Sequence, residues 1–212
     1  MQMGFYFDQT RCTGCDACIV ACKDWHDVPA GPASWIRIRT IEKGKYPDLF
    51  VASLFTSCYH CLEPACLKAC PVNAISKRKQ DGIVAVDRES CLGQDNCQSC
   101  LDSCPYDVPQ FGSEENAKMQ KCGLCLERLA GNRKPICVDA CPMRALDAGA
   151  IEELRAKYGD NREAEGFVYA DKLTPAITFK PRKDIKGLPV QRIEVAPLPG
   201  KTGARHPTGV DP

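Results

Sequence analysis

The apolar and polar positions of this chain form short runs rather than long periodic stretches. The segment SWIRIRTI (residues 34–41) alternates apolar with polar side chains, and LFVASLF (residues 49–55) is a short apolar run. A period of two is typical of a half-buried strand, and Gly44 and Pro47 stand between the two runs. The pattern therefore predicts a β-hairpin inside residues 23–57.

Further short apolar runs predict more strands and one helix. Residues 5–7 read FYF, and residues 83–86 lie in DGIVAVD directly after a turn signal at residues 81–82. The run before that turn, in PVNAISKRKQ, supplies the other strand of a small hairpin. Residues 145–148 can form a strand whose natural partner is residues 5–7. The segment AIEELRAKYG, residues 150–159, predicts a short amphipathic helix that ends at a glycine.

The C-terminal part differs from the rest of the chain in its composition. From about residue 171 onward the chain holds many prolines and few apolar runs. We interpret it as an extended tail that lies on a partner protein, with a disordered tail as the alternative.

The composition fits a globular protein of one or two domains. The chain has 212 residues, of which 44% are hydrophobic and 26% charged, and this excludes the disordered class. A formal net charge of +1 argues against nucleic acid as the main partner. No apolar run reaches the roughly 18 residues that a membrane span needs. The first residues, MQMGFYFDQTRC, show neither a secretory pattern nor a twin-arginine pair.

Sixteen cysteines dominate the composition, and they fall into four groups of four. Small secreted disulfide scaffolds reach this density, but they are shorter and carry an export signal. In each group three residues separate the last cysteine from the one before it, and in three groups a proline follows. The groups are Cys12, Cys15, Cys18 and Cys22; Cys58, Cys61, Cys66 and Cys70; Cys91, Cys97, Cys100 and Cys104; and Cys122, Cys125, Cys137 and Cys141.

The spacing within the groups favours iron–sulfur clusters over zinc or disulfides. Two-cluster ferredoxins use C-x2-C-x2-C-x3-C-P, in which three close thiolates hold one cluster and the fourth holds its neighbour. The first group has this spacing with Lys23 in place of the proline, and the other groups are stretched variants. Zinc prefers two separated C-x2-C pairs, a pattern that only the fourth group approaches. Disulfides between neighbours in so tight a run are strained.

Four stretches carry a resemblance to a known family: RCTGCDACIVACKDWHD, CYHCLEPACLKACPVNAISKRKQDGIVAVD, KCGLCLERLAGNRKPICVDACPMRALDAG and IEELRAKYGD. From Gly4 to about Gly159 the chain is similar to the four-cluster iron–sulfur subunits of the dimethyl sulfoxide reductase family of molybdopterin oxidoreductases. The third group in that family usually reads C-x2-C-x2-C-x3-C-P. Here Gln94, Asp95 and Asn96 look like a three-residue insertion, which bears on the geometry and potential of one cluster.

The resemblance, like the crossover pattern of paired ferredoxins, implies which cysteines share a cluster. One [4Fe–4S] cluster would be bound by Cys12, Cys15, Cys18 and Cys141. A second would be bound by Cys22, Cys122, Cys125 and Cys137. A third would be bound by Cys58, Cys61, Cys66 and Cys104. The fourth would be bound by Cys70, Cys91, Cys97 and Cys100.

The fold class that follows is α+β, with two nested modules like those of bacterial ferredoxins, an inserted β-hairpin and an extended C-terminal tail. Residues 1–22 and 111–150 would form the outer module. Residues 58–110 would form the inner module, and residues 23–57 the inserted hairpin. Residues 151–212 would supply the short helix and the partner-binding tail.

Several residues beside the cysteines are candidates for weaker roles. Ordinary packing is the favoured interpretation of Trp25 and His26, with contact to a cluster or to a subunit interface as the alternative. His60 lies between two cysteines, and because the set of thiols is already complete it is expected to tune a potential by a hydrogen bond. Residues 77–79 are expected to form a turn surface rather than a cofactor site. The basic residues that can offset the negative charge of clusters, or are merely solvated, are Lys23, Lys68, Lys121, Arg128 and Arg144.

The resemblance implies an electron-transfer subunit that does not catalyse alone, and the sequence offers no catalytic residue. Four clusters would relay electrons between a quinone- or quinol-linked membrane subunit and a large catalytic subunit. That catalytic subunit would carry a molybdenum or tungsten bis-pterin cofactor, as in anaerobic respiration. The alternatives are the small subunit of a soluble heterodimer of this kind without a membrane anchor, a free polyferredoxin, and a zinc-binding interaction protein. The expected location is cytoplasmic or membrane-associated, or periplasmic if a partner with a twin-arginine signal carries the chain across.

Overall fold

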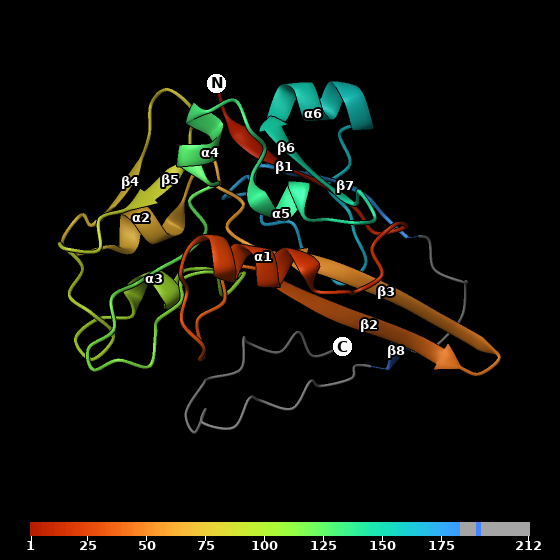
Figure 1. Cartoon of the computed structure of the whole chain (residues 1–212), viewed down its shortest axis with the longest axis horizontal. Helices are drawn as coiled ribbons and strands as arrows, with labels where there is room; N and C mark the ends of the chain where they lie inside the picture. The colour runs from red at the N-terminus through yellow and green to blue at the C-terminus, as the bar shows by residue number, and fades with distance from the viewer. Residues whose placement is uncertain (183–189, 192–212) are drawn as a thin grey trace.

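The computed structural model describes residues 1–182 and 190–191, and it has the mixed helix and strand content of an α+β protein (Figure 1). The strands are β1 (Met3–Asp8), β2 (Arg37–Lys45), β3 (Asp48–Thr56), β4 (Ile75–Lys77), β5 (Val84–Val86), β6 (Leu146–Ala150), β7 (Ile177–Lys180) and β8 (Val190–Gln191). The helices are α1 (Ala17–Trp25), α2 (Ala65–Ala69), α3 (Ser99–Asp102), α4 (Leu126–Ala130), α5 (Ile136–Asp139) and α6 (Ile151–Tyr158).

A three-stranded sheet in the order β6-β1-β7 joins the two ends of the cysteine-bearing region. β1 pairs antiparallel with β6, so that Phe5 lies opposite Ala148 and Phe7 opposite Leu146. The predicted pairing of residues 5–7 with residues 145–148 is therefore confirmed. All six residues of β1 are buried, because the strand has a neighbour on each side and is covered on both faces.

The two faces of β1 meet different parts of the molecule, as the alternation of side chains in a strand requires. On one face the Tyr6 ring stacks on Tyr158 of α6 with 3.7 Å between ring centroids. On the other face Phe5 and Phe7 lie 5.5 and 5.8 Å from the ring of Phe55 in β3. The sheet thus fixes α6 on one side and the long hairpin on the other (Figure 1).

The long hairpin of β2 and β3 is present where the alternation predicts it. Arg37 pairs with Thr56 at the base, and the ladder runs without a break to Lys45 opposite Asp48 at the tip. The turn between them is Tyr46-Pro47, close to the predicted position. Figure 1 shows this hairpin projecting away from the rest of the chain.

The smaller hairpin is also confirmed. β4 and β5 pair antiparallel with Ile75 opposite Val86, and the chain reverses at Gly82, whose φ of 67° suits a glycine. The predicted helix over residues 150–159 is α6, which ends at Gly159.

The tail prediction needs a correction. Residues 177–180 are part of the sheet rather than a separate tail, because β7 lies parallel to β1 with Ile177 opposite Phe5 and Phe179 opposite Phe7; binding of the tail to a partner stays a prediction. Both β7 side chains are fully buried. The remainder of the predicted tail, residues 183–189 and 192–212, lies outside the described residues, while β8 pairs with β2.

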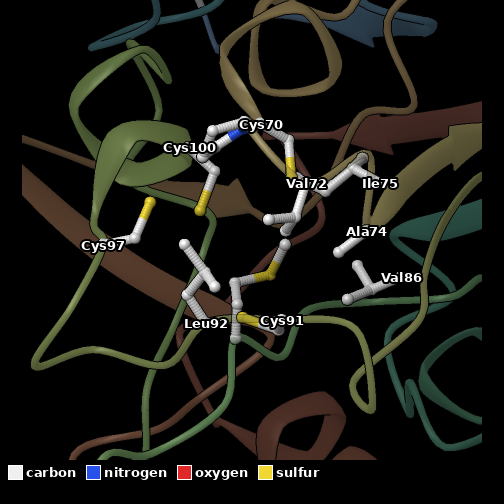
Figure 2. A pocket seen from close by; sticks show the side chains of 11 residues that line it. Cys70, Val72, Ala74, Ile75, Val86, Cys91, Leu92, Cys97 and Cys100 are labelled. Atoms are coloured by element: carbon white, nitrogen blue, oxygen red, sulfur yellow. The ribbon is translucent and has the colours of Figure 1, made fainter.

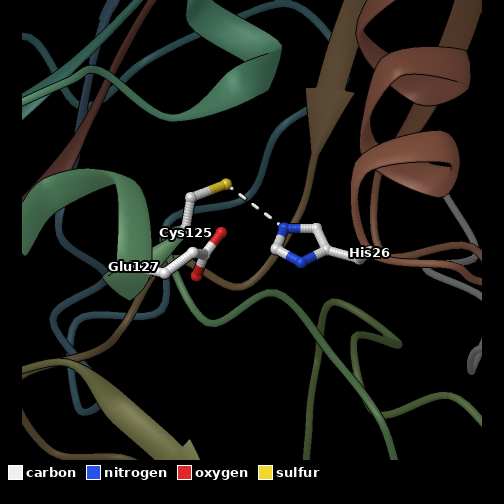
Figure 3. A group of neighbouring side chains, drawn as sticks. All are labelled: His26, Cys125 and Glu127. Carbon is white, nitrogen blue, oxygen red and sulfur yellow. Dashed lines mark hydrogen bonds between the residues drawn. The ribbon is translucent and has the colours of Figure 1, made fainter. Parts of the chain in front are cut away.

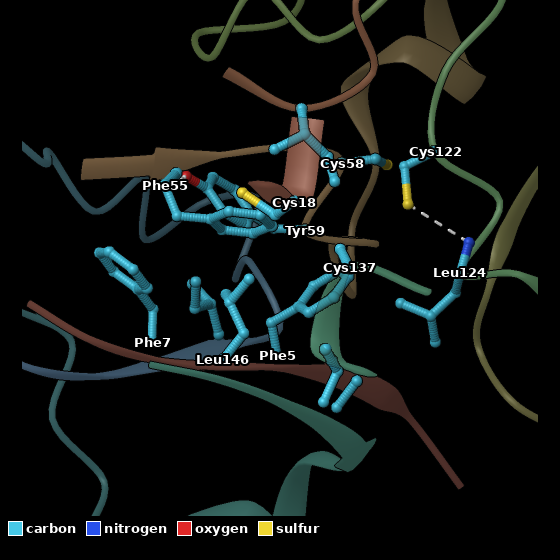
Figure 4. Close-up of a cluster of buried hydrophobic side chains, with 14 of the residues drawn as sticks. Phe5, Phe7, Cys18, Phe55, Cys58, Tyr59, Cys122, Leu124, Cys137 and Leu146 are labelled. Carbon is cyan, nitrogen blue, oxygen red and sulfur yellow. Dashed lines mark hydrogen bonds between the residues drawn. The ribbon is translucent and has the colours of Figure 1, made fainter. Parts of the chain in front are cut away.

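The main core is built from aromatic and aliphatic side chains mixed with cysteines. Figure 4 shows Phe5, Phe7, Phe55 and Tyr59 packed beside the thiol of Cys18, with further cysteines at the edge of the same cluster. The cysteines that belong to this core are Cys18, Cys22, Cys58, Cys122, Cys137 and Cys141. The thiol groups are therefore part of the interior, although the division of the chain into nested modules stays a prediction. Among the residues that the structure describes, no helix combines the length and apolar character needed to cross a membrane.

Candidate metal centres

The C-x3-C ending of each cysteine group lies on or beside a short helix. A four-residue separation corresponds to about 6 Å along a helix axis, so the two thiols of one ending can face different cavities. The endings are Cys18 and Cys22 on α1, Cys66 and Cys70 at α2, Cys100 and Cys104 at α3, and Cys137 and Cys141 at α5. None of the sixteen cysteines, all of which are described, is in a disulfide.

Four thiols surround one cavity near α2 and α3 (Figure 2). Cys91, Cys97 and Cys100 come from the third group, and Cys70 comes from the end of the second group. The remaining lining is apolar and is provided by Pro71, Val72, Ala74, Ile75, Val86, Leu92 and Met119. The cavity therefore brings together one thiol of the second group and three of the third, the same four cysteines that the fourth predicted ligand set contains; their binding of a cluster stays a prediction.

A second cavity repeats the arrangement at the other pair of groups. Cys12, Cys15 and Cys18 line it together with Cys141, which follows them by more than a hundred residues in the sequence. Its apolar lining includes Phe7, Ile38, Met143, Ala145 and Leu146.

The other eight thiols gather into two further sets. Burial raises the pKa of Cys22, and the nearby thiols of Cys122 and Cys125 raise it further. Cys137 also has a raised pKa, with burial as the largest cause, followed by the thiols of Cys122, Cys125, Cys22 and Cys18.

The last set surrounds Cys61. Burial raises its pKa, followed by the thiols of Cys58, Cys104 and Cys66. Burial also raises the pKa of Cys66 to about 11. Without a metal, a buried thiol among other thiols stays protonated, because a buried thiolate is costly in free energy. Coordination to a metal deprotonates the thiol and offsets the cost of burying the negative charge. The chain thus concentrates sulfur atoms in places where their deprotonated form is favourable only beside a cation or a cationic cluster core.

Thiols of different sets are electrostatic neighbours in one order. Cys18 raises the pKa of Cys22, Cys58 raises the pKa of Cys122, and Cys66 raises the pKa of Cys100, although burial is the larger cause in each case. These electrostatic pairs link the set of Cys12 to that of Cys22, the set of Cys22 to that of Cys58, and the set of Cys58 to that of Cys91.

Left-handed backbone turns wrap the chain around the sulfur atoms. Each group contains such a residue, and the φ angles are 69° at Gly14, 46° at His60, 89° at Gly93 and 57° at Leu124. Non-glycine residues in this region cost of order 1–3 kcal/mol and persist only where their surroundings demand it. At Leu124 the turn directs the backbone N–H at the Cys122 Sγ, 3.3 Å away. Successive N–H groups turned inward form a site for an anionic group.

Of the five predicted charge-balancing residues, two are buried, two are exposed and one is half-buried. Lys121 and Arg128 are buried, and Lys121 Nζ donates to the carbonyls of Val84 and Cys122. Lys68 is exposed and pairs with Glu63, and Arg144 is exposed. Lys23 is half-buried and donates to the carbonyl of Ala33.

Lys77 and Lys118 were missed as neighbours of the cysteines. The sequence favours a turn surface for residues 77–79, yet Lys77 Nζ donates to the carbonyl of Cys61 at 2.7 Å. Lys118 Nζ donates to the carbonyl of Cys91 at 2.8 Å. A lysine on a polar stretch gives no sequence signal for such a role.

The two histidines near the cysteines lie in different surroundings. His60 is fully buried; its Nδ1 accepts the Val84 N–H at 3.0 Å, and its Nε2 has no partner among the described residues. Burial, together with the charges of Lys121 and Lys77, holds the pKa of His60 well below its usual value. The neutral ring must therefore carry its hydrogen on the buried, unpartnered Nε2, which fits an acceptor such as a cluster sulfide.

Among the residues that the structure describes, His26 makes the closest contact between a histidine and a cysteine. Its Nε2 lies 3.2 Å from the Cys125 Sγ, and the Glu127 carboxylate is within 4.8 Å (Figure 3). The indole N–H of Trp25 donates to Glu127 Oε1 at 2.7 Å. The two residues are therefore more than ordinary packing beside Cys22, which was the favoured interpretation of the sequence.

The three-residue insertion in the third group forms a loop that hydrogen bonds to Asn116 hold in place. The Asn116 Nδ2 donates to the carbonyl of Leu92, and its Oδ1 accepts from the backbone of Asp95 and the side chain of Asn96. Asp95 in turn accepts the backbone N–H of Asn116 at 2.9 Å. The loop thus extends the spacing without removing Cys97 from the cavity.

Two family models described as 4Fe-4S dicluster domain match the sequence, over residues 50–151 and 11–75. A comparison with curated proteins gives 41% identity over 191 residues to a polypeptide of the anaerobic dimethyl sulfoxide reductase of Haemophilus influenzae, covering 86% of this chain and 90% of the relative. The protein belongs to the iron–sulfur subunits of the dimethyl sulfoxide reductase family.

Relatives with other names also match this iron–sulfur subunit. It is 33% identical over 172 residues to a subunit of the sulfite dehydrogenase of Allochromatium vinosum, covering 72% of this chain and 70% of the relative. It is 33% identical over 163 residues to the formate dehydrogenase-O iron-sulfur subunit of Escherichia coli, covering 70% and 53%. These relatives are subunits of oxidoreductases with three different names, so membership of the family leaves the terminal substrate open.

Proposed function

We propose that the chain carries four [4Fe–4S] clusters and relays electrons between a quinone- or quinol-linked membrane subunit and a catalytic subunit with a molybdenum or tungsten pterin. The observation that carries the proposal is the cavity of Figure 2, where Cys70 of the second group completes the three thiols of the third. A crossover of this kind places two clusters side by side, as in paired ferredoxins. Each cluster supplies reversible one-electron storage when bound.

The residues of the chain suit this role in donor type and arrangement. Thiolates are the ligands preferred by iron–sulfur cores, and the linings of both cavities are otherwise almost free of other metal-binding side chains. The ligand sets are those expected from the sequence: Cys12, Cys15, Cys18 and Cys141; Cys22, Cys122, Cys125 and Cys137; Cys58, Cys61, Cys66 and Cys104; and Cys70, Cys91, Cys97 and Cys100.

The order in which the thiol sets influence one another suits conduction from the set of Cys12 to that of Cys91. The cavity of Cys91 is the last in this order, and exposed Val72 and Leu92 form part of its lining. The cavity of Cys12 is the first, and it is lined in part by exposed Met143. Thin apolar rims at both terminal cavities would let partner proteins exclude water and approach the clusters closely.

The hairpin tip offers a further contact for a partner subunit. Tyr46 is 93% exposed at the turn between β2 and β3. Exposed aromatic residues are enriched at protein interfaces. Tyr46→Ser should keep the iron content and weaken retention of the catalytic subunit during isolation. Equal retention in the variant and the wild type would show that the hairpin tip is not part of the interface.

The proposal is tested by the metal content of the protein isolated natively, without oxygen, with whatever co-purifies. About 16 iron atoms per chain together with molybdenum or tungsten are expected, because four cubane clusters hold four iron atoms each. Zinc without iron would overturn the cluster assignment. Full iron with no molybdenum or tungsten and no co-purifying protein would instead indicate a free polyferredoxin.

A further inference from the structure

The end of α1 brings a histidine onto a cysteine that is distant in sequence. His26 follows α1 directly, and its backbone N–H bonds to the carbonyl of Cys22 at 3.2 Å. This holds the imidazole over the fourth cysteine group, where Nε2 lies 3.2 Å from the Cys125 Sγ (Figure 3). The ring also packs against Trp35, with 4.8 Å between ring centroids. His26 is therefore fixed by its own backbone, by a neighbouring ring and by the sulfur.

The protonation state of the Cys125 sulfur decides which of the two atoms donates the hydrogen bond. A cysteine that ligates iron is a thiolate, which has lone pairs and no hydrogen to give. The hydrogen must then reside on His26 Nε2, and the contact is an N–H···S hydrogen bond. By contrast, His60 cannot donate through Nδ1 to Cys58, 3.8 Å away, because that nitrogen already accepts the Val84 N–H.

We propose that His26 is a positioning residue that raises the reduction potential of the cluster held by Cys22, Cys122, Cys125 and Cys137. It does so by donating the Nε2 hydrogen bond to Cys125. A donor at a ligating sulfur stabilises the more negative, reduced form of a cluster, and hydrogen bonds to the sulfurs are among the factors that set cluster potentials. The inference rests on the proposed function, because it requires a cluster at this set of thiols.

The surroundings of Cys125 single out His26 among the neighbouring polar side chains, beside the backbone N–H of Ile136, which also bonds to Cys125. The indole N–H of Trp25 donates to Glu127 at 2.7 Å. The Arg128 guanidinium lies over the Trp25 ring, 4.6 Å from its centroid, and bonds to the carbonyl of Lys134. Of these side chains, only His26 has a nitrogen within hydrogen-bond distance of the Cys125 sulfur.

His26, Cys125 and Glu127 each place one metal-binding atom, a ring nitrogen, a sulfur and a carboxylate oxygen, within 4.8 Å of the other two. This arrangement resembles a site for a separate metal ion. Two of these three atoms are already engaged. Cys125 belongs to the thiol set of Cys22, and the Glu127 Oε1 accepts the Trp25 indole hydrogen. The hydrogen-bond role of His26 uses this arrangement without displacing either partner.

The test compares two variants by anaerobic redox titration of the natively isolated complex, followed by electron paramagnetic resonance. His26→Phe keeps a ring against Trp35 and removes the donor. His26→Gln places an amide nitrogen near the position of Nε2 and restores a donor. Cys125→Ser identifies the spectral features of the cluster concerned, because it changes one ligand of that cluster alone.

We expect His26→Phe to lower the midpoint potential of the cluster marked by Cys125→Ser and of no other cluster. A tenfold change in its reduction equilibrium corresponds to about 59 mV for a one-electron couple. His26→Gln should recover most of the shift. The control Trp35→Phe keeps an aromatic ring beside His26, loses only the hydrogen bond to Gln120, and should leave the potential unchanged.

Unchanged potential in His26→Phe, or a shift in a cluster that Cys125→Ser does not mark, overturns the inference. If His26→Phe loses iron, His26→Leu serves as the second variant without a donor, and loss of iron in both also overturns it, since the residue would then serve assembly. Failure of the proposed function is recognised separately, because the wild-type protein would then lack the iron content and the cluster signals.

Discussion

Removal of the buried charge of Lys121 should lower the potentials of the two middle clusters. Lys121 is only 6% exposed, and its Nζ donates to the carbonyls of Val84 and Cys122. None of the ion pairs found in the described residues includes it. Its positive charge lowers the pKa of both Cys122 and Cys66, which belong to different thiol sets, although burial dominates for each. The ammonium group therefore lies between two neighbouring sets.

The size of the effect follows from the charge and its distance. Two unit charges about 6 Å apart interact by roughly 3 kcal/mol at an effective dielectric constant of about 20. For a one-electron couple, in which about 59 mV accompanies each tenfold change, this amounts to a shift of roughly 120 mV. Each added electron gains this attraction in the wild-type protein and loses it in Lys121→Met. Partial solvent screening reduces the shift, so about 50–120 mV is expected at each of the two clusters.

The assay is an anaerobic redox titration of Lys121→Met, with Lys68→Met as the matched control. Lys68 follows a cysteine of the second group by two residues, but its side chain is 67% exposed and is paired with Glu63 at 3.0 Å. Solvent screens such a charge, so the control should leave every potential within a few tens of millivolts of the wild-type value. Equal shifts in the two variants, or none in Lys121→Met, would refute the idea that burial gives Lys121 its influence.

Three further predictions concern the ligands, the sheet and the inserted loop. Cys22→Ser should alter the spectrum of the cluster bound mainly by the fourth group; a change confined to the cluster of Cys12 would show that the crossover is assigned wrongly. Gly4→Ala should lower the free energy of unfolding by about 1–3 kcal/mol in thermal or denaturant unfolding, because an added Cβ would lie 2.2 Å from the Ala176 carbonyl oxygen. Gly131→Ala, whose Cβ meets its nearest atom at 3.5 Å, should cost far less. Asn116→Ala should speed the loss of iron from the cluster of Cys91 to a chelator several-fold, because the inserted loop loses its hydrogen bonds; an unchanged rate, or the same effect from Asn132→Ala, would contradict this.

Much of the fold could be predicted because its signals are local. The two hairpins follow from alternation and from turn residues within a few positions of each other, and the pairing of β1 with β6 follows from apolar runs that flank the outer cysteine groups. β7 was missed, since only four residues form it and prolines dominate the surrounding composition. Its place beside β1 depends on the burial of Ile177 and Phe179 next to a strand that lies about 170 residues earlier in the chain. A local sequence pattern carries no information about such a distant neighbour.

The sequence by itself determined the kind of chemistry. Four repeats of a cysteine spacing specify soft sulfur donors in sets of four, since the distances along a short loop and one helical turn are fixed by backbone geometry. Only the tertiary structure decided how the chain surrounds these donors. It brought His26 to Cys125 across 99 residues, buried Lys121 between two thiol sets, and turned Lys77 from an expected surface residue into a partner of the Cys61 carbonyl. Such contacts depend on which faces of distant segments pack together, and a lysine or a histidine looks the same in the sequence whether solvent or a ligating sulfur lies beside it.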